Sequence, residues 1–577
     1  MRLHRVRLRP KSDSPVISPV SAYPAPLDDR LATQSSYAWR WLGLLLVGAI
    51  CAGVFFRFYH LDRKVIWEDE LFATVHMLGY TEAEIVEASP RIDRAADLQR
   101  YFALPQIPLR WPHQITDPVQ SLASEDPQHP PLYYLIGHQW IDRFGSSVTA
   151  LRSLSAVFGV LVLACMFCLC RELFASRRAG VLGAALVAVS PFHVLYAQEV
   201  REYSLWTVAL LLLFITFRHA VRRPTTAAWA IYGLTLAGSL YVYPFSGFVA
   251  LAQGAYAIVL RGGRLDRVVV GYLAAAGAGL ALFCPWLAIM IRSTGLTRGM
   301  SAILHTRTSP LTVLATLLRN VRSVFIDLGR FQLGPVHSTA LNLALAIAVV
   351  ALAAYAFYVL IRSTDRATWA FIVICVCLPM LPVVARDIVS GGGLTNQSRY
   401  FIPLYLGVEL AMVGLIHAQL ESRAIRTRLA GVVIAVLLLG SGVLSCAVSS
   451  QAQTWWNKDY EQNRTVAAVV NAGDHPMVIS DGTTSRTLGL GYYLEPTVRL
   501  RLNLHCDQCS LETPSQPDLL AGALGPGDIF LLGPSPQLLA DPILAAARSQ
   551  SETHVYVIGV STFSDRSHAL TMFAPIQ

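Results

Sequence analysis

The stretch AWRWLGLLLVGAICAGVFFRF, residues Ala38–Phe58, decides the fold class of this chain. A helix of about 20 apolar residues crosses the hydrocarbon core of a bilayer, which is about 30 Å thick. Comparable runs recur along the 577 residues, of which 54% are hydrophobic and only 14% charged. Soluble domains carry about 25% charged residues. The sequence therefore predicts a polytopic α-helical membrane protein.

We expect about eleven transmembrane helices, and the charges between them predict their orientation. The expected limits are residues 38–58, 147–170, 179–197, 203–221, 227–244, 246–260, 268–291, 339–361, 367–385, 400–418 and 428–449. Arginines follow every even-numbered span, as at Arg171 and Arg177 after the second. Because Arg and Lys concentrate in cytoplasmic loops, these exits and the N-terminus are predicted to be cytoplasmic. The net charge of +9 is explained by such loops and does not indicate a nucleic-acid partner.

The first span follows a basic segment, as a secretory signal peptide does. Its apolar region is too long for a signal peptide, and it lacks a clear small-x-small cleavage site. We therefore predict a retained anchor. Residues 1–37, which include a Pro- and Ser-rich part, are predicted to form a disordered cytoplasmic tail.

Three long segments are then predicted on the opposite, extracytoplasmic face: a first loop at 59–146, a loop at about 292–338 and the C-terminal residues 451–577. Residues 38–450 would form the transmembrane domain, which includes the first loop. The C-terminal segment has a helical stretch near Asn457–Ala472 and then the short apolar runs "MVIS", "IFLLG" and "VYVIGV". Helices alternating with short buried strands predict a small α/β domain.

The ten cysteines fall into two groups. Eight lie inside or at the ends of apolar runs and are interpreted as small core residues. Cys506 and Cys509 form "CDQC" in the polar C-terminal segment. A single CxxC supplies only two of the four ligands of a structural zinc site, so a local disulfide or two free thiols are expected.

The stretch "VIWEDELFA", Val65–Ala73, carries three consecutive acids about ten residues beyond the first span. One interpretation of Glu68, Asp69 and Glu70 is a helix start, where the macrodipole favours carboxylates. The other is a functional site, because ionisable residues beside membrane spans often mark function. The stretch alone does not decide between these interpretations.

Other extracytoplasmic turns carry complementary groups. "DPQHPPLYYLIGHQW" places His129 before two prolines, "YAQEVREYS" crowds Glu199 and Arg201 into one turn, and "NQSRYFIP" carries Arg399 and Tyr400. A carboxylate can act as general base, Arg can bind a phosphate, and carboxylates with His can hold a divalent cation. Such a set suits transfer of a group from a lipid phosphate, although a lone Arg at a span end is more often an interfacial anchor.

In this order, the motifs resemble the polytopic glycosyltransferases of the GT-C fold, most closely the protein-mannosyltransferase and aminoarabinose-transferase group of glycosyltransferase family 39. The resemblance covers about residues 40–420. It implies hexosyl or pentosyl transfer, with inversion, from a polyprenyl-phosphate-sugar donor to a lipid, glycan or protein acceptor outside the cytoplasm. It assigns catalysis to Asp69, Glu70 and Glu199, and donor-phosphate binding to His129, Arg201, Arg399 and Tyr400.

One departure from the family pattern concerns metal binding. Some relatives have an acidic residue and then Lys before the two prolines, and that acid can serve as a metal ligand. Here the pair is Gln128-His129, although Glu125 and Asp126 are near. The resemblance therefore leaves open whether a divalent metal cation takes part.

Two further features have a functional and a structural interpretation. The aromatic stretch Leu132–Trp140 is predicted to be an amphipathic helix on the membrane surface, either under the active site or as an interfacial anchor. Tyr241, Tyr243 and Pro244 would line a sugar pocket, or the tyrosines would belong to the interfacial aromatic belt. Glu409 lies near the middle of the tenth span, where it must be neutral or paired.

Two other functions are alternatives to glycosyl transfer. A transporter or flippase of lipid-linked glycans would place its site near the midplane and often shows internal repeats, which this sequence lacks. A non-catalytic glycan-binding scaffold would not need the acid and arginine set. The chain ends in "FAPIQ" without a retention signal, which favours a bacterial inner membrane. The sugar and the acceptor are not predicted.

Overall fold

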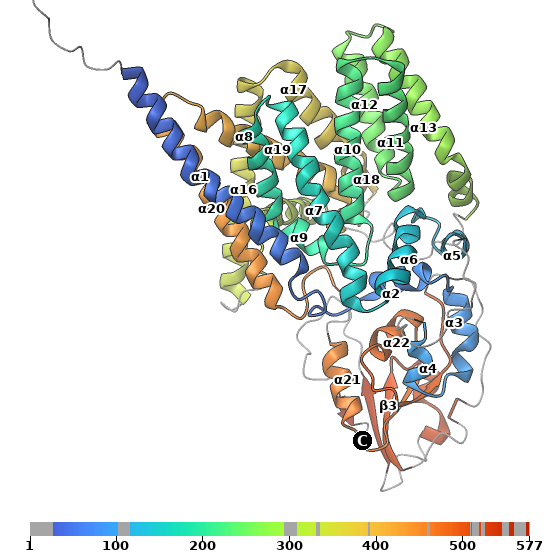
Figure 1. The fold of residues 1–577 in the computed structure, drawn as a ribbon. Helices are drawn as coiled ribbons and strands as arrows, with labels where there is room; N and C mark the ends of the chain where they lie inside the picture. The colour runs from blue at the N-terminus through green and yellow to red at the C-terminus, as the bar shows by residue number, and fades with distance from the viewer. Residues whose placement is uncertain are drawn as a thin grey trace, which may run out of the picture. The chain divides into compact units, whose positions relative to one another are not determined.

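The computed structural model describes residues 27–101, 116–293, 309–329, 335–390, 393–458, 462–507, 509, 519–520, 526–544, 553–558 and 573–575. Residues 1–26 of the predicted tail lie outside the described residues, as do residues 294–308 and 330–334 of the predicted loop at 292–338. The last part of the predicted tail, residues 27–37, belongs to helix α1. The chain divides into two units, residues 1–45 and 46–577, and the boundary falls inside helix α1 (Leu27–Phe58). Figure 1 shows the elements in chain order.

Eight stretches of the described residues are long and apolar enough to cross a membrane. They are Trp41–Phe58 in α1, α7 (Val148–Leu173), α10 (Tyr203–Arg222), α13 (Arg267–Arg292), Ala340–Ser363 in α16 (Pro335–Ser363), Arg366–Val389, Ser398–Leu420 and α20 (Ile425–Gln451). The polytopic helical class is thus confirmed. The count of eleven is not, because the third expected span is a bent pair and the fifth and sixth are the shorter helices α11 (Thr226–Val242) and α12 (Ser246–Leu260).

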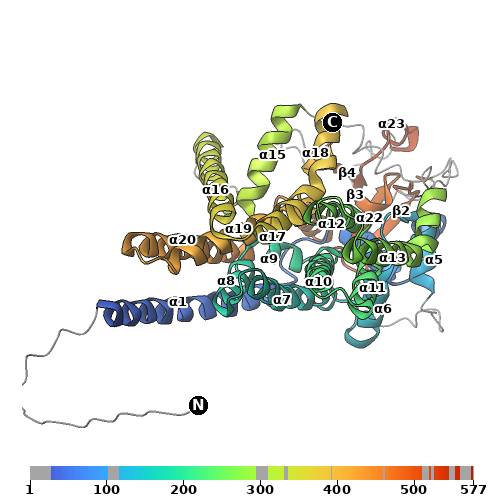
Figure 2. The same ribbon diagram turned by 90° about the horizontal axis from the view of Figure 1, so that it is seen from above.

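Most packed pairs of helices in the first half of the bundle are close together in the chain. Helix α7 contacts α8 (Arg177–Ala188) and α10, α10 contacts α11, and α11 contacts α13 (Figure 2). Helix α19 (Ile402–Leu420) lies between α16 and α20. The stretch Arg366–Val389 is irregular and consists of α17 (Arg366–Phe371), η2 (Ile372–Cys377), η3 (Leu378–Met380) and α18 (Leu381–Ser390).

The third expected span, predicted as one helix, is broken by 63° between α8 and α9 (Pro191–Ala197). Pro191 has no backbone N–H and disfavours a helical conformation at Ser190, which is extended. Arg57 of α1 donates hydrogen bonds to the carbonyl oxygens of Val187 and Ala188, at 3.0 and 2.6 Å. These bonds supply donors to carbonyls beside the break, where the apolar bundle holds no water to do so.

Short helices lie between the first two spans. They are α2 (Glu68–Met77), α3 (Glu82–Ala88), η1 (Ser89–Arg91), α4 (Ala95–Gln99), α5 (Asp117–Glu125) and α6 (Leu132–Phe144). Helix α6 contains the predicted aromatic stretch. Three more precede α19: α15 (Pro310–Ser323), η4 (Leu394–Asn396) and η5 (Ser398–Phe401).

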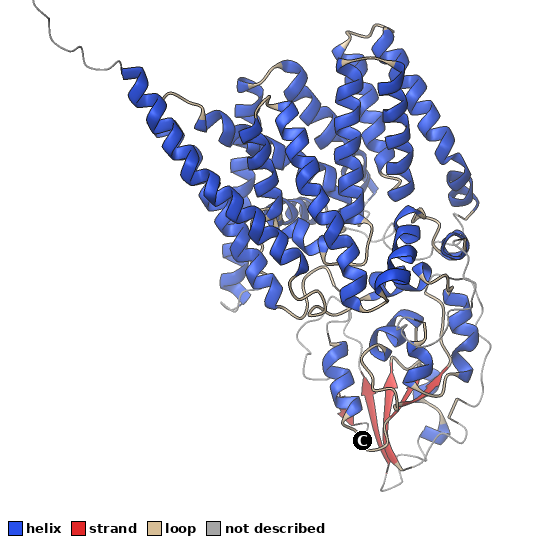
Figure 3. Ribbon diagram, in the orientation of Figure 1, coloured by secondary structure: helices blue, strands red, loops and turns tan. Residues whose placement is uncertain are grey.

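The C-terminal segment forms one five-stranded sheet in the order β2-β1-β3-β4-β5. The strands are β1 (Met477–Ser480), β2 (Arg499–Leu502), β3 (Gly527–Leu532), β4 (Thr553–Ile558) and β5 (Phe573–Pro575), and only β4 and β5 pair antiparallel. The helices are α21 (Asn463–Asn471), α22 (Thr484–Gly491) and α23 (Pro536–Leu539). Figure 3 shows the strands gathered in one region, outside the apolar helices.

The predicted α/β character is confirmed, and the three apolar runs are β1, β3 and β4. Strand β2 was not predicted because its alternation of Arg and Leu is short and charged. The predicted helix at Asn457–Ala472 begins only at Asn463.

The first loop and the C-terminal segment share one hydrophobic core. Ile85, Ile92 and Leu98 of the loop pack in one cluster with Val478 and Leu500 of the sheet. The backbone N–H of Ile66 also donates to the Tyr493 hydroxyl at 2.9 Å. The sheet therefore contributes directly to the position of α2, which follows Ile66.

We expect Gly53→Ala to destabilise the protein by about 1–3 kcal/mol, the usual range for overpacking. A Cβ at Gly53 would overlap the carbonyl group of Ala188 at the break. The matched control is Gly48→Ala in the same helix, where an added Cβ meets nothing within 4 Å. Thermal unfolding in detergent compares the two variants, and equal stability would contradict close packing at the break.

Candidate active site

Helix α2 places the three adjacent acids in its first turn, as the helix-start interpretation predicts. Successive residues on an α-helix point about 100° apart, so neighbours reach different surroundings. Glu70 is fully buried, whereas the Asp69 side chain retains 22% exposure. The two carboxylates therefore have different environments.

Glu70 is the centre of a buried ion-pair network. It accepts two hydrogen bonds from Arg152 of α7, at 2.8 and 2.7 Å, one from Lys458 Nζ at 2.9 Å and one from the Val200 backbone N–H at 3.0 Å. Burial raises the pKa of Glu70, but Arg152 and Lys458 outweigh it and lower the pKa to about 2. Glu70 is thus ionised, and the four bonds fix its position.

Arg152 has its remaining hydrogen-bond donors committed to the backbone. They bind the carbonyl oxygens of Leu61, Lys64 and Val65 at 2.6–2.9 Å. The guanidinium is fully buried with Glu70. Arg152 therefore fixes both α2 and the chain that leads into it.

Asp69 faces two arginines. Arg399 Nη1 donates to Asp69 Oδ2 at 2.6 Å. Arg201 Nη1 donates to the Asp69 carbonyl oxygen at 3.3 Å, and its Nε lies 3.9 Å from Oδ2. Burial raises the pKa of Asp69, but Arg399, Arg201 and His129 together bring it below its ordinary value.

Glu199 lies in the turn after α9 and is fully buried. It lies 3.4 Å from Lys458 Nζ and accepts a hydrogen bond from the Asn457 amide. Burial raises the pKa of Glu199 to about 7, although Lys458 opposes the shift. Glu199 therefore titrates near neutral pH, unlike Glu70.

His129 joins the turn that holds Arg201 and Glu202. Its Nδ1 lies 2.9 Å from Glu202 Oε1, and Arg201 Nη2 lies 3.0 Å from its Nε2. An arginine can only donate, so Nε2 accepts and the proton of a neutral ring is on Nδ1, facing Glu202. Burial raises the pKa of Glu202, but Arg201 and His129 lower it to about 2.

Aromatic rings surround this group. The Tyr243 ring lies 6.4 Å from His129 and 6.2 Å from Tyr400, and Arg399 lies 5.6 Å from the Tyr203 ring. Tyr241, in contrast, donates to the Leu282 carbonyl and is partly exposed. Of the two tyrosines considered for a sugar pocket, the structure therefore brings only Tyr243 to the site.

The structure brings the seven predicted site residues into one neighbourhood, while their individual roles remain predictions. Sequence reasoning missed Arg152, Lys458 and Asn457. Arg152 could have been found as a charge inside the apolar α7. Lys458 and Asn457 follow the last span in a segment that was assigned only to the start of a helix.

The midspan acid has a partner. Glu409 Oε2 lies 3.2 Å from His193 Nε2, and Glu409 is fully buried. The prediction that this charge is neutral or paired is consistent with this contact. His193 belongs to α9, so the pair also anchors the helix that leads into the Glu199 turn.

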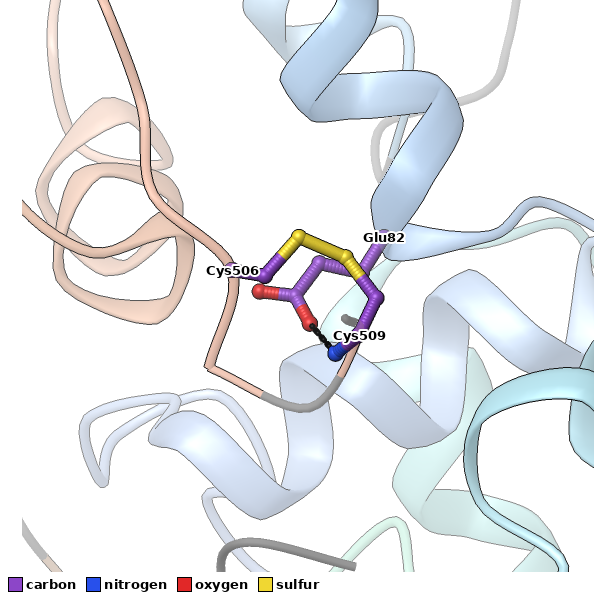
Figure 4. A group of neighbouring side chains, drawn as sticks. All are labelled: Glu82, Cys506 and Cys509. Carbon is purple, nitrogen blue, oxygen red and sulfur yellow. Dashed lines mark hydrogen bonds between the residues drawn. A yellow bond between two sulfur atoms is a disulfide. The ribbon is translucent and has the colours of Figure 1, made fainter. Parts of the chain in front are cut away.

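Within the described residues, three His, Cys, Asp or Glu side chains come close enough to share a metal ion only at Glu82, Cys506 and Cys509. A disulfide joins the two cysteines, one of the two expected alternatives, so neither offers a thiolate (Figure 4). Glu82 accepts hydrogen bonds from the backbone N–H groups of Asp507 and Cys509, at 2.6 and 3.2 Å. These residues do not fit a metal centre, and we derive no step through a metal.

Comparison with known families now bears on this geometry. The family model described as dolichyl-phosphate-mannose-protein mannosyltransferase matches residues 128–289. The matched segment contains His129 and the turn of Glu199, Arg201 and Glu202. The chain resembles the polytopic glycosyltransferases of the GT-C fold. This confirms the resemblance drawn from the sequence motifs. No curated protein sequence matches the chain.

The chain is also similar to solved structures, among them the following two. ArnT from Cupriavidus metallidurans, bound to undecaprenyl phosphate, is 12% identical with a TM-score of 0.47, over 80% of this chain and 86% of that one. The oligosaccharyltransferase AglB from Archaeoglobus fulgidus, in complex with an inhibitory peptide and a dolichol-phosphate, is 13% identical with a TM-score of 0.40. That match covers 83% of this chain and 61% of the AglB chain.

We expect Arg152→Met to destabilise the protein by about 3–5 kcal/mol, because it leaves the buried Glu70 carboxylate without its main partner. The control is Arg178→Met, which removes an exposed pair with Glu421, 3.2 Å apart, and should cost about 0–1 kcal/mol. Denaturation of the purified variants in detergent gives both values. A small effect at Arg152 would mean that the network does not support the fold.

Proposed function

We propose that this protein is a membrane glycosyltransferase that moves a sugar from a polyprenyl-phosphate donor to an acceptor hydroxyl on the extracytoplasmic face. One observation carries the proposal: the partly exposed carboxylate of Asp69 lies against the guanidinium groups of Arg399 and Arg201. A base and a phosphate-binding group are thereby adjacent, as transfer from a sugar phosphate requires. The family match at residues 128–289 supports the same reaction class.

In the proposed reaction, Asp69 takes the proton of the acceptor hydroxyl as its oxygen attacks the anomeric carbon. The bond from that carbon to the phosphate oxygen breaks on the opposite face, which inverts the configuration. The electron pair leaves with the phosphate. Arg399 and Arg201 stabilise the charge that develops there, and Tyr400 and His129 lie beside them.

The other two acids are given different roles. Glu70 has four hydrogen bonds and no exposure, so we assign it to positioning α2 rather than to proton transfer. Glu199 shares Lys458 with Glu70 and keeps a pKa near neutrality. We propose that its negative charge balances Lys458 during turnover and orients the turn that carries Arg201.

We further propose a bacterial inner membrane location, with the N-terminus in the cytoplasm and the C-terminal sheet outside. The arginine-rich exits of the even-numbered spans support this orientation. The sheet packs against the first loop, so it lies on the same side as α2. It is therefore well placed to bind a lipid, glycan or protein acceptor.

We expect Asp69→Asn to reduce sugar transfer by about 10²–10⁴-fold, the usual contribution of a general base, while donor binding persists. The assay is transfer from a panel of polyprenyl-phosphate sugars by the detergent-purified protein. The control is Asp93→Asn, at an exposed acid of the same loop, with 68% side-chain exposure. Full activity of the Asp69 variant would remove this residue as the base.

The raised pKa of Glu199 predicts a pH dependence. If its charged form is needed, transfer should fall as pH drops through about 7, because Glu199 then becomes protonated. Asp69 has a lowered pKa and stays ionised over this range. Rates between pH 5.5 and 8.5 (roughly one to two units around that pKa) should lose this limb in Glu199→Gln. An unchanged profile would show that the Glu199 charge does not matter.

A further inference from the structure

The ion pair between Asp69 and Arg399 joins the proposed base directly to a proposed phosphate-binding residue. The 2.6 Å hydrogen bond occupies the Arg399 donor that points toward the carboxylate. The same bond lowers the pKa of Asp69 and so makes it a weaker proton acceptor. In this arrangement Arg399 Nη1 and Asp69 Oδ2 bind each other and not the substrates.

Arg399 is nevertheless able to change partners. Its side chain is 12% exposed, and its Nε is buried without a hydrogen-bond partner among the described residues. Three aromatic rings, those of Trp67, Tyr203 and Tyr400, lie 5.6–5.8 Å from the guanidinium. Cation–π contacts with these rings help to hold the guanidinium in this place when its hydrogen-bond partner changes.

The carboxylate of Asp69 is held less firmly than that of its neighbour Glu70. Glu70 has four hydrogen bonds and no exposure, whereas the side chain of Asp69 is 22% exposed and bound closely by Arg399 alone. Arg201 contributes only a distant 3.9 Å contact to the Asp69 carboxylate, because it is also engaged with His129 and Glu202. A phosphate dianion or monoester beside Arg399 would therefore compete with a single strong bond.

We propose that the phosphate of the donor releases the base: it displaces Asp69 from Arg399, so that the carboxylate can accept a proton only when the donor is bound. This inference rests on the proposed function and adds the coupling between its two halves. No covalent change is involved, since one anion replaces another on the same cation. The coupling would make the enzyme inert toward an acceptor, or toward water, until the donor has bound.

Competition between Asp69 and the phosphate for Arg399 predicts the direction in which phosphate affinity changes when Asp69 is replaced. If Asp69 occupies Arg399 in the empty protein, removing the carboxylate must strengthen phosphate binding. Coupling of this kind between two sites typically changes affinity 5–150-fold, and it acts equally in both directions. A residue needed only to hold the site together would instead weaken binding when replaced.

The experiment is a titration of the full-length, detergent-purified protein with undecaprenyl phosphate, followed by native mass spectrometry. We expect Asp69→Asn and Asp69→Ala to bind it about tenfold more tightly than the wild type, toward the lower end of the usual coupling range. Undecaprenol, which lacks the phosphate, should bind all three proteins alike. Thermal unfolding confirms that the variants are folded.

The control is Asp93→Asn. Asp93 is an acid of the first loop with 68% side-chain exposure, and it lies 3.3 Å from Arg501 rather than beside Arg399 or Arg201. Its replacement should change affinity less than about twofold, since it shares no partner with the proposed phosphate-binding residues. Equal tightening at Asp93 and Asp69 would reveal a general charge effect and would overturn the proposed displacement.

Arg399→Ala separates this inference from the proposed function. If Arg399→Ala weakens undecaprenyl phosphate binding but the Asp69 variants do not strengthen it, Arg399 binds the phosphate and the displacement is refuted. If Arg399→Ala leaves binding unchanged, the phosphate-binding role itself fails, together with the inference that rests on it.

Discussion

The buried pair between Glu70 and Arg152 is the interaction on which the rest of the site depends. Transfer of two charges out of water costs several kcal/mol per ion, and their attraction offsets this only when the remaining donors and acceptors are also satisfied. In this protein the donors and acceptors come from three segments that are far apart in the sequence: α2, the first turns of α7 and the connector that carries Lys458. The pair therefore assembles the site only when all three are in place.

Two adjacent acids have opposite tasks because a helix turns by about 100° per residue. Glu70 points into the network and is immobilised, and Asp69 points toward Arg399 with part of its surface open. Neither task follows from the letters "EDE". The division arises from where α2 is held, and this position depends on Arg152 and on the Tyr493 contact from the C-terminal segment.

Patterns that depend on local physics could be predicted from the sequence: apolar runs gave the membrane helices, and short apolar strands gave β1, β3 and β4. The turn motifs also led to Asp69, Arg201 and Arg399, which do meet, and to Glu199, which lies beside Lys458. Lys458 could not be predicted, because its partners Glu70 and Glu199 lie 388 and 259 residues earlier in the chain. The bend at Pro191 was not predicted, because hydropathy measures how apolar a segment is and not whether its helix is continuous.

That bend explains how charged residues come to lie beside apolar helices. A straight third span would continue in the direction of α8. Arg57 instead binds the carbonyls beside the break, where the chain turns into α9. With the 63° break, α9 begins at Pro191, is paired with Glu409 through His193 and ends at Ala197, and Gln198 follows as its C-cap residue. Gln198 then binds Lys64 at 3.0 Å, next to the first-loop carbonyls that Arg152 holds. The irregular backbone is thus paired within the protein, as the apolar surroundings require. Its geometry brings Arg201 to Asp69, and Glu199 to Lys458, which also binds Glu70.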